Sequence, residues 1–225
     1  MITDVAGLRL LQMCSPALPV GAFAYSEGLE TVAHEGGVDA SAWILGRLRR
    51  GPARTDAPIA KRLYAAWRSA SPGAASNAAV DDWNATLFAL RESRELREAD
   101  RDMGQALARL LVDLGVADAA PWRQRPDATF VTLFTLAAAR WDVPCQATLA
   151  GLLWTWLEGQ VAAAVKLVPL GQTAGQKLLF AAAAEIPALV AAALAMDDDD
   201  IGALAPGAAL AAARHETLEV RLFRS

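Results

Sequence analysis

The 225-residue sequence is poor in metal-binding side chains, with two cysteines, Cys14 and Cys145, and two histidines, His34 and His215. Neither cysteine has a CxxC or CxxH spacing, which argues against a disulfide framework or a structural zinc site and favours a reducing compartment. Neither histidine has further ligands at the three- or four-residue spacing that would close a metal site. His34 and Glu30, one helical turn apart, are expected to form a surface pair. The sequence therefore predicts no metal ligands.

Catalytic and nucleotide-binding motifs are also missing, among them GxSxG, the P-loop, GxGxxG and HExxH. The acidic run Asp197–Asp200 does not fit a calcium loop, because Ile201 occupies a ligand position and Ala208 stands where glutamate is needed. His215 and Glu216 are adjacent, and adjacent residues on a helix point in different directions, so they do not converge on a substrate. These absences favour a helical interaction protein over an enzyme, with no catalytic and no cofactor-binding residues.

Basic charge is not in excess, because 21 Lys and Arg stand against 25 Asp and Glu, a net charge of −4 at pH 7. A nucleic-acid binder usually has a basic face, so nucleic acid is not an expected partner. The N-terminal stretch has no basic leader and Asp4 comes early, unlike a signal peptide. Glu158 and Glu185 interrupt the apolar stretches 146–168 and 181–196, which we interpret as buried helices rather than membrane spans. We expect a cytoplasmic protein without a membrane partner.

Runs of alternating β-branched residues are absent, and proline and glycine separate segments with helical periodicity. The 54% hydrophobic content includes much alanine, which favours helix. Thr173 followed by Gln176 fits a capping box at one helix start. Helices are expected at roughly 23–34, 39–50, 56–69, 79–113, 127–140, 145–167, 173–183, 187–196 and 207–217. The sequence thus predicts an all-α fold, a single-domain bundle of about nine to ten helices that includes residues 1–225.

The segment 91–111 has the clearest amphipathic pattern. Its apolar residues recur at three- and four-residue spacing and consist of Leu96, Ala99, Met103, Leu107 and Leu110. On the polar side, Arg91 is expected to pair with Glu95, and Arg94 with Glu98, each pair adding a few tenths of a kcal/mol. The charged face is either a solvated surface over a core stripe or a surface that contacts a partner.

The segment 145–167 is apolar nearly all round, which is typical of a central helix. Trp154 and Trp156 point in different directions on it, so at least one should face a second element or a second subunit. Lys166 lies in its last turn, where a cation complements the helix dipole. The alternative for Lys166 is a contact with a partner.

The stretch SPALPVGAFAYSEGLE, residues 15–30, combines two prolines and a glycine with an aromatic pair. The prolines prevent the preceding helix from continuing, and Gly21 permits a tight turn. A phosphate-binding turn is unsupported, because the stretch lacks a following lysine and a preceding strand. We expect a helix to begin at Phe23 and Tyr25, and the rigid corner to place Phe23, Tyr25 and Glu27 near an assembly surface.

Four stretches in order along the chain together resemble the family of the urease accessory protein UreF. They are LLQMCSPALPVGAFAYSEGLE (10–30), SRELREADRDMG (93–104), AAVKLVPLGQTAGQ (163–176) and RHETLEVRLFRS (214–225). The resemblance extends over essentially the whole chain and is weakest over 51–90. It implies a non-catalytic, all-helical adaptor or chaperone that forms homodimers and binds UreD (also called UreH) and the GTPase UreG. Such a protein helps deliver nickel to apo-urease, with nickel and GTP belonging to UreG and no intrinsic cofactor.

The resemblance also assigns residues. The C-terminal pieces are similar to the family segment that orders with UreD and helps recruit UreG, which implies partner binding by Arg214, His215, Glu216, Arg221, Leu222, Phe223 and Arg224. Lys166 matches the lysine of the family's KLVPLGQ motif and is expected on the UreG-facing surface. Glu219 and Val220 replace the Tyr-Ser that many members have there. We define residues 219–225 as the tail and expect it to be flexible, with too few neighbours to order alone.

Two further functions remain open. The protein could regulate GTP hydrolysis by UreG directly, with Arg221 or Arg224 supplied in trans to stabilise charge during phosphoryl transfer. It could instead be a stand-alone enzyme with a pocket around His215 and Glu216.

Overall fold

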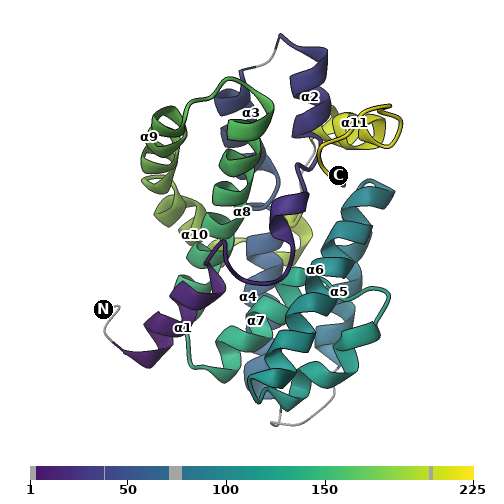
Figure 1. Ribbon diagram of the computed structural model, residues 1–225. Coiled ribbons are helices and arrows are strands. Elements are labelled where there is room, and N and C mark those ends of the chain that lie inside the picture. Colours follow the sequence, from purple (N-terminus) through teal and green to yellow (C-terminus); the bar gives the residue numbers. More distant parts are fainter. Residues whose placement is uncertain (1–3, 38, 71–77, 203–204) are drawn as a thin grey trace.

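The computed structural model describes residues 4–37, 39–70, 78–202 and 205–225 (Figure 1). These residues contain helices and no strand, so the predicted all-α fold is confirmed. The eleven α-helices and three short 3-10 helices exceed the nine to ten expected. In chain order they are α1 (Val5–Met13), η1 (Ala22–Ala24), α2 (Leu29–Glu35), α3 (Ala40–Arg50), α4 (Asp56–Ser69), α5 (Ala78–Ala89), α6 (Arg94–Asp113), η2 (Ala117–Gln124), α7 (Phe130–Arg140), α8 (Cys145–Leu167), α9 (Gln172–Ala183), α10 (Ile186–Ala195), η3 (Asp198–Asp200) and α11 (Pro206–His215).

The long helix α8 is the centre of the fold, as its apolar sequence predicted. Helices α1, α2, α3, α4, α7, α9 and α10 all pack against it, and Figure 1 shows it running through the middle of the molecule. Leu149, Leu153 and Leu157 are fully buried on it. Trp156 turns toward the connector before α2, where its indole N–H donates to the Glu27 carboxylate at 3.0 Å. The expectation that a tryptophan of α8 faces a second element is therefore confirmed.

Helices α4 to α7 form a second packed group below α8 in Figure 1. Trp67 of α4 and Trp122 of η2 meet edge to face, with ring centres 6.0 Å apart. The Trp67 indole N–H is satisfied by the Thr132 carbonyl at 3.1 Å, as a buried indole requires. This group holds α6 in place, so it fixes the helix whose first turn carries part of the candidate site.

The predicted helix 79–113 is wrong in one respect, because the chain breaks between α5 and α6. The Ser93 hydroxyl accepts from the Leu96 N–H at 3.1 Å and starts a new helix. Arg91 turns inward and pairs with Asp56 and Asp100 instead of Glu95. Leaving the buried Asp56 and Asp100 without Arg91 would cost several kcal/mol, more than the few tenths of a kcal/mol that a surface pair would contribute.

The predicted helix 23–34 is also wrong, because only the short η1 forms before Tyr25 and α2 begins at Leu29. Glu27 and Gly28 have φ of 52° and 87°, in the left-handed region that interrupts a helix. A Cβ on Gly28 would lie 2.8 Å from the Ala212 amide nitrogen of α11. The glycine therefore permits both the turn and the close approach of α11.

Two smaller predictions differ at helix starts. The segment 127–140 begins as a helix only at Phe130, because the Thr129 side chain caps it by accepting from the Thr132 N–H at 3.3 Å. The capping box at Thr173 is wrong, since α9 begins at Gln172 with no side-chain cap. The 3-10 helix η2, which precedes α7, was not predicted.

Among the described residues, no single helix is long and apolar enough to cross a membrane. Helices α9 and α10 taken together would pass the same test of length and composition, but they are bent by 41° at the break between them.

Candidate functional site

The tail lies along the connector between η1 and α2 in the structure (Figure 1). The Arg224 N–H donates to the Ala24 carbonyl at 2.8 Å. The Ser225 carbonyl accepts from the Ser26 N–H and hydroxyl, each at 2.6 Å, and from the Glu27 N–H at 3.1 Å. The expectation that the tail has too few neighbours is therefore wrong for this conformation, because its backbone binds its own chain.

Glu30 of α2 continues this recognition of the tail backbone. Its carboxylate accepts from the Leu222 N–H at 2.6 Å and from the Phe223 N–H at 3.0 Å. It also contacts the His215 ring Nε2 at 2.9 Å. Burial raises the pKa of Glu30, but the hydrogen bonds from His215 and the two amides outweigh it and hold the pKa below its usual value. The tail is thus bound by an ionised carboxylate.

His215, the last residue of α11, has no exposed surface and joins the tail to two helices. Its Nε2 faces Glu30 of α2, and its Nδ1 lies 2.7 Å from Glu95 of α6. The second Glu95 oxygen accepts from Arg221 of the tail at 2.7 Å. We call Glu30, Glu95, His215 and Arg221 the tail lock. The expected surface pair of His34 with Glu30 is wrong, because Glu30 is buried and turned toward α11.

The outer side of the tail is apolar and cationic. Val220 and Leu222 are 82% and 66% exposed. The Lys166 ammonium lies 5.7 Å from the centre of the buried Phe223 ring, a distance typical of a cation–π contact. The exposed side chains of this region are called the tail surface and consist of Lys166, Val220, Arg221, Leu222 and Arg224. Phe223 anchors the surface from beneath and is not part of it.

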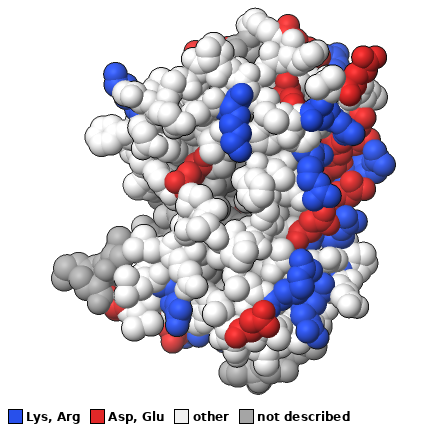
Figure 2. All heavy atoms as spheres, viewed as in Figure 1, with Lys and Arg blue, Asp and Glu red and all other residues white. Residues whose placement is uncertain are grey.

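The remaining assigned residues of the C-terminal region lie in exposed ion pairs. Arg214 binds Glu35 of α2 at 3.1 Å, and Glu216 binds Arg94 of α6 at 3.3 Å. Figure 2 shows charged side chains of both signs gathered on the side of the molecule where α2, α6 and α11 meet. His215 and Glu216 have different partners, as their adjacency predicted.

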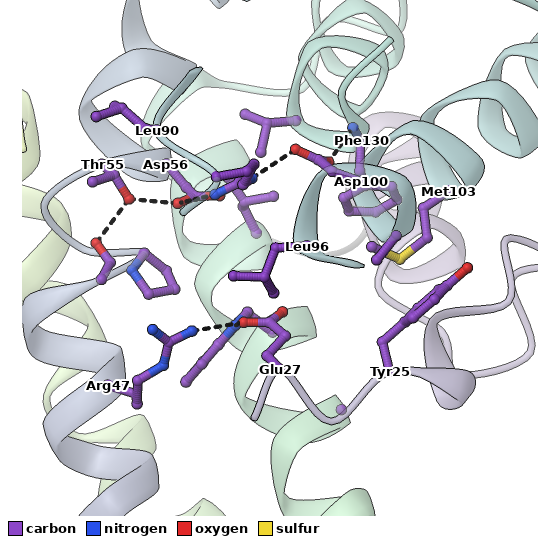
Figure 3. A pocket seen from close by; sticks show the side chains of 18 of the residues that line it. Tyr25, Glu27, Arg47, Thr55, Asp56, Leu90, Leu96, Asp100, Met103 and Phe130 are labelled. Atoms are coloured by element: carbon purple, nitrogen blue, oxygen red, sulfur yellow. Dashed lines mark hydrogen bonds and ion pairs between the residues drawn. The ribbon is translucent and has the colours of Figure 1, made fainter. Parts of the chain in front are cut away.

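The three residues expected on an assembly surface lie in two different places. Phe23 is 72% exposed, whereas Tyr25 is buried. Figure 3 shows Tyr25 and Glu27 at a cavity between the connector and the helices, with Glu27 bound to Arg47 at 3.0 Å. Of the three, Phe23 has the most exposed side chain. The chain turn after η1, which sequence periodicity did not reveal, separates them.

The cavity in Figure 3 has a volume of about 280 Å³. On its far side Arg91 bridges Asp56 at 2.7 Å and Asp100 at 2.8 Å. Burial raises the pKa of both carboxyl groups; for Asp56 the Arg91 charge outweighs burial and lowers the pKa, whereas the pKa of Asp100 stays above its usual value. Arg91 balances one of the two carboxylate charges, and the Phe130 N–H donates to Asp100 at 2.7 Å, which indicates a structural role for this group.

A second cavity of about 320 Å³ lies beside the first. The residues that line both are Ala22, Phe130, Thr155 and Gly159. Burial is the largest cause that raises the pKa of Cys14 and of Glu158 in this second cavity. A thiol with a raised pKa is a poor nucleophile, so Cys14 is not suited to covalent catalysis.

The described residues contain no group of three or more His, Cys, Asp and Glu that could hold a metal ion. The tail lock illustrates why, since the two nitrogens of the His215 ring point away from each other toward different carboxylates and do not converge. The same enclosure leaves the ring without access to a substrate, which argues against an enzyme built around it. The run Asp197–Asp200 is exposed.

Comparison with known proteins links this arrangement to one family. Urease accessory protein UreF of Hahella chejuensis is 46% identical over 98% of this chain and 99% of its own length. That of Alkalilimnicola ehrlichii is 48% identical over 98% and 96%. A family model described as UreF matches residues 35–183. The chain belongs to the UreF family. The resemblance seen in the sequence is therefore confirmed.

The two UreF relatives and that of Azoarcus sp., 45% identical over 100% of both chains, extend beyond the matched region at both ends. The connector and the tail thus lie outside the residues matched by the UreF model but inside the alignments with UreF proteins. The sequence suggested Glu30 and Glu95 only as members of surface pairs, with His34 and Arg91, and not as site residues. The available signal for Glu95 was its position one turn before the buried Ala99, on the apolar side of α6.

Proposed function

We propose that this chain is a non-catalytic adaptor of urease maturation that binds UreD (UreH) and the GTPase UreG. In this proposal it forms a homodimer in the cytoplasm and supports GTP-dependent nickel insertion into apo-urease. Nickel is the cargo and GTP the substrate of UreG, so neither is a resident cofactor of this chain. Membership of the UreF family supports the role in urease maturation. The observation that carries the adaptor role is the tail surface.

The tail surface has the chemistry of a protein-binding site. Two apolar side chains, Val220 and Leu222, are exposed to solvent beside the cations Arg221 and Arg224. Arginine is enriched at interface hot spots, and the fully buried centre of an interface is more apolar than its rim. The matching partner surface is an apolar pocket with carboxylates at its edge, which arginine binds in two-point contacts. We assign this surface to UreD.

Two residues assigned to partner binding are buried, so in this proposal they position the tail and do not contact the partner themselves. His215 has no exposed surface and Phe223 is 6% exposed. Both hold the tail against the helices while Leu222 faces outward. Lys166, which contacts Phe223, continues the cationic surface toward the end of α8 and is assigned to UreG.

Replacing Leu222 with serine is expected to weaken binding of UreD about tenfold or more, the effect of removing one apolar hot spot. Biolayer interferometry with immobilised UreD measures it. Leu8→Ser is the matched control, because Leu8 is 57% exposed on α1 and remote from the tail in sequence. Equal affinities for the parent and Leu222→Ser proteins would remove the assignment. Native mass measurement of the protein alone, with an expected mass of two chains, tests the homodimer separately.

A second candidate function is direct regulation of GTP hydrolysis by UreG. Arg224 favours it, because its side chain is 70% exposed and its ion pair with Asp102 is long, at 4.0 Å. Arg221 is held closely by Glu95 and is a poorer candidate. An arginine supplied in trans can stabilise the charge of phosphoryl transfer.

Arg224→Ala is therefore expected to return single-turnover GTP hydrolysis by UreG in the complex toward the rate of UreG alone. Arginines of this kind contribute about 10³-fold or more. Arg68→Ala is the control, since the Arg68 side chain is also exposed, at 51%, but lies on α4 outside the residues assigned to partner binding. If adding this protein and UreD left the hydrolysis rate of UreG unchanged, the regulatory function would be rejected.

A further inference from the structure

The tail lock brings four ionisable side chains together in a largely buried position. The side chains of His215, Glu95 and Glu30 are 0%, 6% and 9% exposed, and only Arg221 reaches water substantially, at 41%. They come from three helices and the tail. Ionised groups are costly to bury unless each is paired, so their protonation states are constrained by their contacts.

Both nitrogens of the His215 ring face carboxylate oxygens, at 2.9 Å from Glu30 and 2.7 Å from Glu95. A neutral imidazole carries one N–H and one lone pair, whereas the imidazolium carries two N–H donors. An ionised carboxylate only accepts hydrogen bonds. The amides of Leu222 and Phe223 require an accepting Glu30. Two donated hydrogen bonds from the ring therefore require both nitrogens to be protonated.

The surrounding charges agree with a protonated ring. Glu30 from α2 and Glu95 from α6 carry two negative charges, which His215 and Arg221 of the tail balance. Two more exposed ion pairs join the same elements, Arg214–Glu35 and Arg94–Glu216. Each consists of one cation and one carboxylate, so neither pair supplies a charge to the tail lock. A neutral ring would leave one unbalanced negative charge and a lone pair directed at a carboxylate oxygen.

We propose that His215 is an imidazolium that fastens the tail to α2 and α6, and that loss of one ring proton releases the tail. The ring holds Glu30 and Glu95 in the positions from which they bind Leu222, Phe223 and Arg221. Release converts the docked tail into a free segment. That such release would change the binding of a partner rests on the proposed adaptor function. A rise in pH therefore opens the lock.

Acid also opens it, by a different group. Burial raises the pKa of Glu30, but hydrogen bonding outweighs it and holds that pKa below its usual value. The contribution of Glu30 to docking is therefore complete above the pKa of the free carboxyl group and is lost as the pH falls through the lower pKa of the docked state. Docking is strongest between these two limits.

The protonation state can be observed directly in the unmodified full chain. The sequence has two histidines, so the long-range ¹H–¹⁵N spectrum of the imidazoles contains two rings, and exposed His34 supplies the reference. We expect both His215 nitrogens to be protonated while the tail is docked. We expect cleavage within the tail by limited proteolysis to rise about tenfold, the effect of losing one charged hydrogen bond, in step with the loss of the second ring proton in the same spectra. A singly protonated ring in the docked state would overturn the proposal.

Glu95→Gln tests the same inference without removing the histidine. The glutamine oxygen can accept from Arg221 while its NH₂ donates to a neutral ring Nδ1, so this lock no longer needs the second proton. We expect the tail of Glu95→Gln to stay docked as the pH rises. Glu35→Gln is the matched control, because Glu35 pairs with Arg214 between the same α2 and α11, and it should retain the parent pH profile. Identical profiles for Glu95→Gln and the parent protein would also overturn the proposal.

These measurements use the chain alone and are independent of UreD and UreG. A protonation-dependent tail with no effect of Leu222→Ser on UreD would reject the adaptor assignment and retain the lock. The reverse pair of results would reject the lock and retain the adaptor.

Discussion

Arg91→Met is expected to lower the free energy of unfolding by about 3 to 5 kcal/mol, the cost of leaving a buried ion pair without one partner. Arg91 binds Asp56 through two nitrogens, at 2.7 and 3.2 Å, and Asp100 through a third, at 2.8 Å. Methionine keeps much of the apolar volume but supplies no donor. Two carboxylates then face the cavity of Figure 3 without the cation that bridges them.

The pH dependence of this defect separates lost charge from lost packing. In the parent protein burial raises the pKa of Asp56, but Arg91 outweighs it and holds the pKa low, so Asp56 contributes stability that is lost as the pH falls through the folded-state pKa. Without Arg91, burial, the largest cause at both groups, is opposed only by the Thr55 hydrogen bond and the Arg47 charge at Asp56 and by the Phe130 N–H at Asp100, so we expect the folded pKa of both carboxyl groups to rise. Protonation then favours the folded state, and the deficit of Arg91→Met shrinks as the pH falls.

Urea unfolding of both proteins at several pH values measures the difference. Arg49→Met is the control, because Arg49 also binds a carboxylate through two nitrogens, Glu185 at 2.8 and 2.7 Å, but on the exposed surface. Exposed pairs contribute little, so only a small change is expected there. A deficit for Arg91→Met that did not vary with pH would assign the loss to packing instead of charge.

The role of Arg91 also explains which parts of the fold the sequence predicted. The apolar sequence of α8 identified a buried central helix with the bounds 145–167. A helix that is buried on every side is apolar all round, and this can be recognised from its own sequence without reference to other segments. The break before α6 depends on Asp56, 35 residues earlier in the chain, which binds Arg91. Such a contact has no signature in local periodicity, which is why one helix was predicted for 79–113.

The same limit applies to the candidate site. Arg221 and Leu222, which we propose to bind a partner, are adjacent in the chain and were predicted from a contiguous motif. Glu30 and Glu95 become recognisable only when α2, α6 and α11 meet, since they bind His215 across 185 and 120 residues. Helical position predicted Glu30 beside His34, yet tertiary pairing in a buried site is stronger than a surface contact one turn away.

The approach of α6 to the segment before α7 rests on Gly104. A Cβ on Gly104 would meet the Ala128 carbonyl oxygen and lie 2.9 Å from the carbonyl carbons of both Ala128 and Thr129. These are backbone atoms, which cannot rotate away. Asn84 fixes the segment further, because its side-chain oxygen accepts from the Thr129 N–H and hydroxyl at 3.2 and 3.0 Å. The added methyl group must therefore separate α6 from α7.

Gly104→Ala is accordingly expected to lower the free energy of unfolding by about 2 kcal/mol. Overpacking costs about 3 kcal/mol at its upper end, and the gain of about 1 kcal/mol that alanine brings to a helix interior offsets part of this cost. Gly46→Ala in α3 is the matched control, since its Cβ would meet only the end of the Arg50 side chain, at 4.0 Å. Calorimetric unfolding should show a lower Tm for Gly104→Ala and an equal or higher Tm for Gly46→Ala. A higher Tm for both variants would mean that α6 and α7 can separate without cost. The position of Glu95 on α6 would then not depend on the close contact at Gly104.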